Sequence, residues 1–199
     1  IPIPIFITEP AIGYGLGAAV GYFHKRKGDE KTGTADFAPA YTTGTPPGSG
    51  RNRESKRPPT ITGVAAAYTD KGTWAVGAGH SASWKKDTIR YQGILAYANV
   101  NSTFYFLDVP FDFSLRGGIL YQNIRFRLGK SDFFLGGKLS YFNADGEFKL
   151  GEGAPDGFFE RSTNDGGLAF QAVWDTRDNT MTPDAGQFFE AVMWRYDDA

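Results

Sequence analysis

Several residues in this chain have the types and spacing that chemistry requires. The run Gly13–Ala18 fits G-x-G-x-x-A, a pattern of dinucleotide-binding turns, and Asp36 stands near the position of a ribose-binding acid. Such a site needs a helix directly after the glycines, because the pyrophosphate lies at the helix N-terminus. Here a strand-like alternation continues to Tyr22 and a polar segment follows. The pattern therefore predicts a strand and no bound nucleotide.

The other reactive side chains lack the partners that catalysis or metal binding needs. Ser83 and Lys86 fit S-x-x-K, but the S-D-N and K-T-G elements that accompany such a nucleophile are absent. The two histidines, His24 and His80, show no ligand spacing, and the chain has no cysteine for a thiolate or a disulfide. We therefore expect a protein that is not an enzyme and that binds no cofactor and no metal.

A polar cluster separates two strand-like runs near the end of the sequence. Asp175, Asp178 and Asp184 could serve as paired carboxylates for acid–base chemistry, yet Asp and Asn also favour turns by bonding to nearby backbone. Arg177 can offer its planar guanidinium to either flanking carboxylate. We expect a structural turn in which Asp175, Asp178 or turn carbonyls hold Arg177. The residues of this turn are Asp175, Arg177, Asp178, Asn179, Pro183 and Gly186.

The composition limits the class of protein that must position these residues. The chain has 199 residues, of which 41% are hydrophobic and 16% aromatic, and this suits a single β-rich domain. Its net charge of -1 gives no case for a nucleic-acid partner. The chain has no run of about 20 apolar residues, which excludes membrane-spanning helices. A mean hydropathy of -0.36 is still compatible with a membrane β-barrel, where only alternate residues face lipid.

Period-two alternation is the dominant pattern of the sequence. Between residues 12 and 22, apolar or aromatic residues alternate with Gly and Ala, as in a strand with two different faces. We expect the larger residues to face lipid and the glycines to face a lumen. The larger residues are Ile12, Tyr14, Leu16, Ala18, Val20 and Tyr22, and the glycines include Gly13, Gly15 and Gly17. Further strand-like runs cover 60–69, 73–84, 88–98, 114–128, 132–143, 166–174 and 187–196.

The connections and charges between these runs suggest an orientation. Residues 25–59 form a long polar loop that we place outside the cell, and the connection at 144–165 should lie on the same side. Both connections can lie on the same side only if a short extra strand lies near 103–107, which gives about nine strands in all. We place Arg125 and Arg127 in the lumen, because an arginine facing lipid at mid-bilayer costs roughly 2–4 kcal/mol. The four tryptophans lie near the ends of runs and predict aromatic girdles.

The polar turn also carries a resemblance to a known family. Asp-Thr-Arg-Asp-Asn at 175–179, followed by Pro183-x-x-Gly186, resembles the strand–turn–strand motif of the BamA/TamA-like outer-membrane "surface antigen" barrels. Similar segments follow the family's order at 4–17, 68–74, 87–91, 126–129 and 134–137. The resemblance implies an antiparallel transmembrane barrel of sixteen strands. Residues 1–199 would then be an incomplete, N-terminal portion of about nine strands, in a short form without POTRA domains.

This interpretation gives definite expectations for shape and function. The runs at 12–22 and 188–196 should form open edges, and the alternative is a small closed barrel of eight strands. The resemblance implies a bacterial outer-membrane protein with a role in envelope biogenesis, or as a pore or surface antigen. Its partners would be the lipid bilayer, with lipopolysaccharide or client proteins as further candidates. The alternative function is a soluble lipocalin-like β-barrel ligand binder, whose apolar side chains would point inward.

Overall fold

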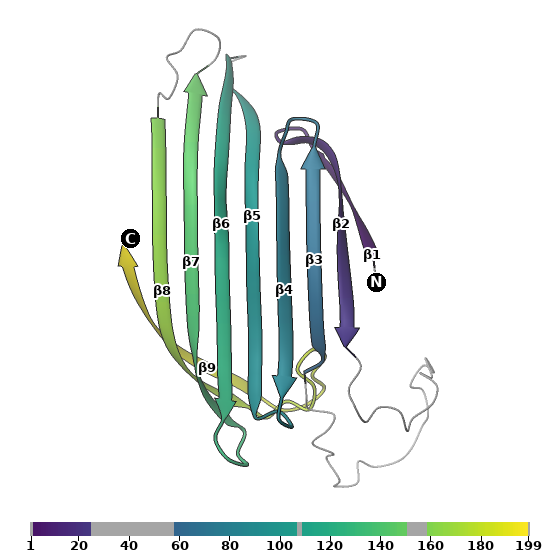
Figure 1. Ribbon diagram of the computed structural model, residues 1–199, viewed down its shortest axis with the longest axis vertical. Helices are drawn as coiled ribbons and strands as arrows, with labels where there is room; N and C mark the ends of the chain where they lie inside the picture. Colours follow the sequence, from purple (N-terminus) through teal and green to yellow (C-terminus); the bar gives the residue numbers. More distant parts are fainter. Residues whose placement is uncertain (1, 25–57, 107–108, 151–158, 199) are drawn as a thin grey trace.

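The described part of the chain folds into a single antiparallel β-sheet. The computed structural model describes residues 2–24, 58–106, 109–150 and 159–198. Nine strands pair in the order of the sequence, and no helix occurs among these residues (Figure 1). No described segment therefore forms a helix of the length and apolar character that crosses a bilayer. The predicted all-β, antiparallel fold of about nine strands is confirmed.

The strand bounds follow the predicted runs closely in the first half of the sheet and extend beyond them in the second half. The run predicted at 60–69 is β3 without any change, whereas the run predicted at 88–98 belongs to a strand of 18 residues. The strands are β1 (Pro2–Glu9), β2 (Gly13–His24), β3 (Thr60–Thr69), β4 (Trp74–Trp84), β5 (Ile89–Phe106), β6 (Val109–Arg127), β7 (Phe133–Leu150), β8 (Phe159–Asp175) and β9 (Phe188–Asp198).

Two predictions about the strands are wrong. Residues 103–107 do not form a separate strand, because β5 continues without a break to Phe106 and pairs there with β6. The residues of β2 do not form an edge, because β1 pairs with them from Pro2↔Val20 to Glu9↔Gly13. Pro2 and Pro4 hid this strand in the sequence. Proline cannot donate to a ladder, but an edge strand tolerates it where the missing N–H would face away from the sheet.

The two long connections leave the sheet at opposite ends. His24 pairs with Thr60 at the end of the sheet that also holds the turn between β4 and β5, whereas Phe148 pairs with Phe159 at the other end. The prediction that both connections lie on the same side is therefore wrong. The connection predicted at 144–165 shortens to 151–158, because β7 and β8 are longer than expected. Most of the loop predicted at 25–59 lies outside the described residues.

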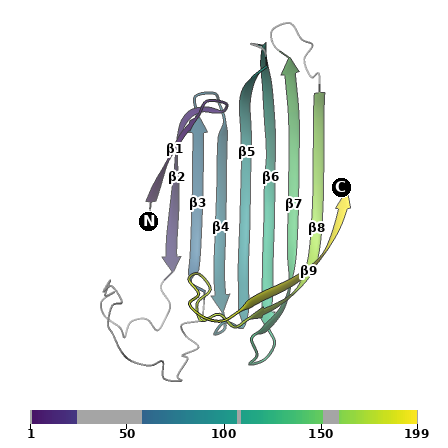
Figure 2. The same cartoon turned by 180° about the vertical axis from the view of Figure 1, so that it is seen from behind.

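The sheet is open and curved. Within the described residues, β1 pairs only with β2 and β9 only with β8, so no contact closes a ring. The two views show that β9 sweeps back across the lower ends of the neighbouring strands, on the side facing the reader in Figure 2. We call this side the concave face and the opposite side the convex face. The nine strands thus form a trough whose two faces have different surroundings.

The convex face carries large apolar side chains that are exposed. Along β2 the alternation is as predicted, with Leu16 66% exposed and Gly15 and Gly17 on the concave side. Added Cβ atoms at these glycines would collide with the backbone of β3, so the glycines allow the two strands to curve. The exposed convex set is Phe6, Tyr14, Leu16, Val20, Tyr22, Val64, Tyr68, Trp74, Val76, Trp84, Leu95, Tyr97, Tyr105, Ile124, Phe126, Phe133, Leu139, Tyr141, Leu168, Phe170, Trp174, Phe189 and Met193.

The concave face divides into two zones. Toward the end of the sheet that holds the turn between β3 and β4, small and apolar residues of β3 to β7, together with Ile5 of β1, line a hollow of about 470 Å³. Toward the other end, charged and amide side chains of β4 to β9 gather under the loop that joins β8 to β9. This polar zone contains most of the buried polar residues, and it holds the candidate site.

Candidate functional site

The centre of the polar zone is a buried ion pair network around Arg90. The Arg90 guanidinium donates Nε and Nη2 to the two oxygens of Asp87, each at 2.8 Å, and Nη1 to Asp175 Oδ2 at 2.6 Å. All three residues are buried, with Arg90 only 6% exposed. Such bidentate, charge-assisted bonds are among the stronger hydrogen bonds in proteins. They tie the start of β5 to the end of β8, with β6 and β7 between them in the sheet order.

A second arginine and an aromatic ring complete the network. Arg127, from the end of β6, donates Nη2 to Asp87 Oδ2 and Nε to the Asp87 backbone carbonyl, the latter at 3.0 Å. The Phe134 ring is fully buried, and the guanidinium carbons of Arg90 and Arg127 each lie 4.3 Å from its centroid. A cation over an aromatic face is stabilised most where water is excluded. Phe134 therefore holds both guanidinium planes in place.

An unusual turn aims Asp87 at these arginines. Lys85, Lys86 and Asp87 all have positive φ angles, of 49°, 56° and 68°. Each non-glycine residue in this region costs roughly 1–2 kcal/mol, so the turn needs compensation. Ser83 supplies part of it by donating to Asp87 Oδ1 at 2.8 Å, and the two arginines supply more. The S-x-x-K pattern thus has a structural explanation, because the hydroxyl of Ser83 binds Asp87 and no contact joins it to Lys86.

The polar turn predicted from the sequence is a well-bonded hairpin loop. Thr176 and Gln187 exchange hydrogen bonds at its base, where the Thr176 amide donates to the Gln187 carbonyl at 2.9 Å. Asp178 Oδ1 accepts from the amides of Asn179, Asp184 and Ala185 at 2.8–3.2 Å. Asn179 Oδ1 accepts from the amides of Met181 and Thr182, at 2.9 and 3.3 Å. These are the backbone-mimicking bonds expected of Asp and Asn in turns.

Arg177 and Gly186 lock this loop to the strands. Arg177 donates Nε and Nη2 to Asp175 at 2.8 and 3.2 Å and Nη1 to the Thr180 carbonyl at 3.4 Å, and its guanidinium lies 4.4 Å from the Phe188 ring. Of the two flanking carboxylates, Asp175 is therefore the partner. Gly186 has a φ of 100°, and a Cβ there would lie 2.5 Å from the Thr176 carbonyl. Pro183 lies exposed in the same loop.

Amide side chains continue the network across the concave face. Gln171, which is fully buried, donates Nε2 to Asn123 Oδ1 at 2.5 Å. Asn123 Nδ2 and Arg125 Nη2 both donate to Gln92 Oε1, at 3.4 and 3.2 Å. Arg125 and Arg127 thus share the concave face, but only Arg127 joins the Asp87 network, and their position in a lumen stays a prediction. Further along, Lys138 pairs with Glu190 at 2.9 Å.

Sequence reasoning missed the centre of this site. It singled out Arg125, Arg127 and the turn residues, whereas Asp87, Arg90 and Phe134 were named only within the family-like segments 87–91 and 134–137 and were given no role. A signal existed in the alternation of Arg90 and Gln92 with Ile89 and Tyr91, which marks a polar face opposite an apolar one. The bond from Arg90 to its second partner, Asp175, could not be predicted, because the two residues lie 85 positions apart in the sequence.

The other sequence motifs have structural roles. The Gly13–Ala18 run lies in β2 and is followed by more strand, as predicted. His24 Nε2 and His80 Nδ1 both lie 2.8 Å from Thr62 Oγ1, so the two histidines are joined through a threonine on the convex face. Among the described residues, no three His, Asp or Glu side chains converge on a position that would hold a metal ion.

The carboxylates in the turns predict a pH dependence of stability. Burial by itself raises the pKa of Asp87, but the hydrogen bonds and charge of Arg90, with help from Ser83 and Arg127, outweigh it and hold the pKa below the ordinary 3.8. Backbone amides, that of Ala185 foremost, also lower the pKa of Asp178. A lowered pKa contributes stability that is present above the unfolded-state value and is lost as pH falls through the folded-state value.

We therefore expect a urea midpoint that stays level from pH 8 to 5 and falls below about pH 4. Equilibrium unfolding in a non-ionic detergent, followed by tryptophan fluorescence, measures it. Asp87→Asn should be less stable than the unmodified chain at pH 7 and should lose less stability on acidification. An equal acid-induced loss in both proteins would show that Asp87 is not the titrating group.

Comparisons with known proteins give no further assignment. No family model, no curated protein and no solved structure matches this chain.

Proposed function

We propose that this chain is part of an integral outer-membrane β-barrel, whose convex face contacts lipid and whose concave face lines the lumen. The observation that carries the proposal is the band of exposed apolar side chains on the convex face. Exposed apolar patches of this extent mark surfaces that contact another molecule or a membrane. The band continues over β2 to β9, which fits a surrounding solvent of lipid better than a single partner.

The dimensions of the band support a bilayer. On β2 it extends from Tyr14 to Tyr22 and on β7 from Phe133 to Tyr141, which is nine residues in each case, counted inclusively. A tilted transmembrane strand needs about 9–11 residues to cross the hydrocarbon core. Beyond Tyr141 the convex side of β7 turns polar, with Asn143 and Asp145. The apolar region therefore ends where a hydrocarbon region of this thickness would end.

The band also crosses the strands obliquely. At this end of the band, the border residue, meaning the outermost large apolar residue of the band on a strand, is Trp74 on β4, and Trp74 pairs with Asn99 of β5. On β5 the border residue is Tyr97, two positions earlier than Asn99. Tyr141 of β7 pairs in turn with Gly166 of β8. The border thus shifts along the pairing register from strand to strand. A membrane plane produces this shift when strands are tilted by about 35–45°, as in outer-membrane barrels.

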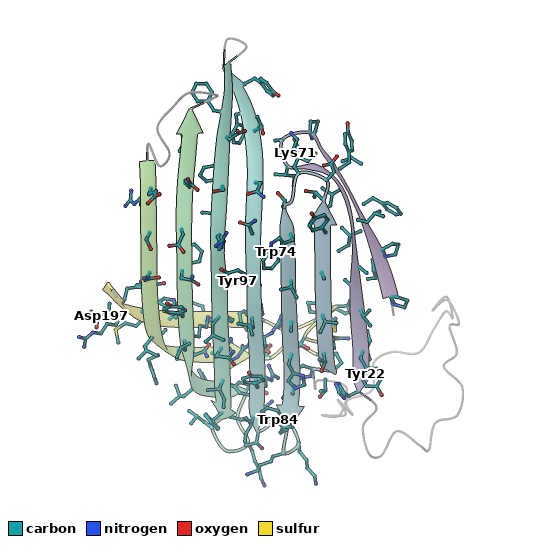
Figure 3. The ribbon with its side chains drawn as sticks, turned by 45° about the horizontal axis from the view of Figure 1, so that its top comes forward. Tyr22, Lys71, Trp74, Trp84, Tyr97 and Asp197 are labelled. Atoms are coloured by element: carbon teal, nitrogen blue, oxygen red, sulfur yellow. The ribbon has the colours of Figure 1, made fainter. Side chains whose placement is uncertain are left out.

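Aromatic side chains line both borders of the band. Near one end of the sheet Trp74 lies 5.7 Å from Tyr97, between ring centroids, and near the other end Trp84 stacks on Tyr91 at the same distance. Figure 3 shows Trp84 and Tyr22 near the lower ends of their strands, and Trp74 beside Tyr97 farther up. Aromatic rings of amphipathic character occupy the headgroup level of membrane barrels. Their positions agree with two interfaces about one bilayer apart.

The role of the barrel follows from the sequence resemblance. The bonds made by Asp175, Arg177, Asp178 and Asn179 give the BamA/TamA-like motif a physical basis, since each residue stabilises the loop at 176–187. We propose kinship with that group on these residues, and hence a function in envelope biogenesis or as a pore or surface antigen. The proposed location is the bacterial outer membrane, with the lipid bilayer as the principal partner.

Tryptophan quenching tests the proposal. Trp74, Trp84 and Trp174 lie on the convex face. Trp194 lies on the concave face, because it pairs with Ala169, which in turn pairs with Lys138 on that face. In variants that keep one tryptophan each, lipids brominated near the headgroup should quench Trp84 strongly and Trp194 little. The measurement uses the chain folded into vesicles. A chain that stays in solution without binding vesicles, or equal quenching of the two residues, would contradict the proposal.

A soluble ligand binder is the second candidate, and one observation favours it. The hollow of about 470 Å³ on the concave face is almost entirely apolar, with Ala65, Ala96 and Ile119 in its lining. Its volume lies within the range of small-molecule sites. The convex band opposes this candidate, because a soluble barrel would expose polar residues there. The vesicle experiment distinguishes the two, since a soluble binder remains in the supernatant.

A further inference from the structure

A second hollow on the concave face has a basic lining. Its volume is about 300 Å³, and it lies between β4, β5, β6, the loop that joins β8 to β9, and the start of β3 with the two prolines before it. Arg90, Arg125 and Arg177 all contribute to its walls, together with Ser81, Gln92 and Met181. Three guanidinium groups lie around this small space, so it matters which of them have a carboxylate partner.

Within the polar zone, the described cations are matched by carboxylates, with Arg125 as the exception. Arg90 and Arg177 share Asp175, Arg127 contacts Asp87 and Asp132, and Lys138 pairs with Glu190. Among the described residues, no carboxylate oxygen lies within 4 Å of the Arg125 guanidinium, whose one hydrogen-bond partner is the amide oxygen of Gln92 at 3.2 Å. A half-buried guanidinium without a direct ion pair is costly, although the charges of Glu190 and Asp175 act on it from farther away, and a bound anion would lower that cost.

Neutral donors stand beside Arg125. Gln92 Oε1 accepts from both Asn123 Nδ2 and Arg125 Nη2, so the Gln92 amide is oriented with its NH₂ group away from these two side chains. Ser81 pairs with Gln92 across β4 and β5, and Arg90 pairs with Arg125 across β5 and β6. The hydroxyl, the NH₂ group and the guanidinium therefore lie on adjacent positions of one face and border one hollow.

We propose that this basic pocket binds an oxyanion of the size of phosphate, held by Arg125, Gln92 and Ser81. Arg125 supplies the charge, while Gln92 and Ser81 supply neutral hydrogen bonds. Arg90 and Arg177 add positive potential, but Asp87 and Asp175 already take most of their donors. The phosphate is either free or carried on a small soluble ester. The site is defined by the concave face alone, so it does not depend on whether that face lines a membrane pore.

Calorimetric titration with inorganic phosphate tests the site. The full chain is folded in a maltoside detergent, and glycerol 3-phosphate is titrated in a second arm to distinguish a free phosphate from a phosphate ester. We expect saturable binding of at least one of these anions, and a loss of affinity of about tenfold or more in Arg125→Gln. The matched control is Arg116→Gln, which removes an exposed arginine from the convex face of the same strand and should leave binding unchanged.

A second variant separates loss of the site from loss of the fold. Gln92→Glu keeps an oxygen for Asn123 and Arg125 but replaces the NH₂ donor by a negative charge. It should fold as stably as the unmodified chain, since Arg125 gains an internal counter-charge, and it should bind no phosphate. Absence of saturable binding to the unmodified chain would overturn the proposal, and so would binding by Arg125→Gln or Gln92→Glu as tight as that of the unmodified chain. Neither result would affect the test of membrane insertion by tryptophan quenching.

Discussion

Arg90→Gln should cost the protein about 3–5 kcal/mol of its free energy of unfolding, the penalty for removing one member of a buried ion pair. The variant leaves the Asp87 carboxylate with Arg127 and Ser83 alone, and it releases the contact between β5 and β8. It also removes one of the two cations that lie over Phe134. Urea unfolding of the detergent-folded chain, monitored by tryptophan fluorescence, measures the change.

The control for this experiment is an arginine on the other face. Arg116 is exposed on the convex side of β6, beyond the border of the apolar band. Arg116→Gln should change stability by no more than about 0.5 kcal/mol, as is usual for surface substitutions. Equal stabilities of Arg90→Gln and Arg116→Gln would show that the buried network contributes nothing specific to the fold.

Phe170→Arg should destabilise the vesicle-inserted chain by about 2–4 kcal/mol, because it places a charge near the middle of the proposed lipid-facing band. Phe170 is 55% exposed on β8, between Leu168 and the border residue Trp174. Phe189→Arg places the same charge opposite Trp174, at the border, and should cost only about 0–1 kcal/mol. The free energy of unfolding from vesicles by urea measures both.

This pair of variants discriminates between membrane and solvent around the convex face. In a soluble protein the arginines would project into water, and both substitutions would have small and similar effects. A depth-dependent difference requires a hydrocarbon region between two interfaces. Equal and small losses in Phe170→Arg and Phe189→Arg would therefore count against the membrane proposal.

The sequence predicts the fold best where its alternation is strongest. The bounds of β3 and most of β2 follow from period-two patterns with distinct faces. The far ends of β5 to β8 were not predicted, because segments such as Ser162–Asn164 carry polar residues on both faces beyond the apolar band. β1 was missed because Pro2 and Pro4 argue against a strand unless its edge position is known.

The candidate site was predictable only in part, for a related reason. Local patterns revealed the turn at 175–186, since Asp178 and Asn179 bind backbone groups within seven positions. The Arg90 network depends on where distant strand ends meet, and that follows from the curvature of the whole sheet. The balance of charge around Arg125 likewise became visible only when the partners of every neighbouring cation were known.

The bond between Arg90 and Asp175 has a consequence for the order of folding. The strands pair in sequence order, so each hairpin can form from neighbouring segments soon after both are present. The ion pair instead joins residues that lie 85 positions apart. If the segment between them is still flexible, the length-dependent part of the loop-closure entropy costs about 4 kcal/mol. Pairing of β5 to β8 removes that flexibility first. The ion pair should therefore form late, acting as a latch that slows unfolding and leaves the rate of folding almost unchanged.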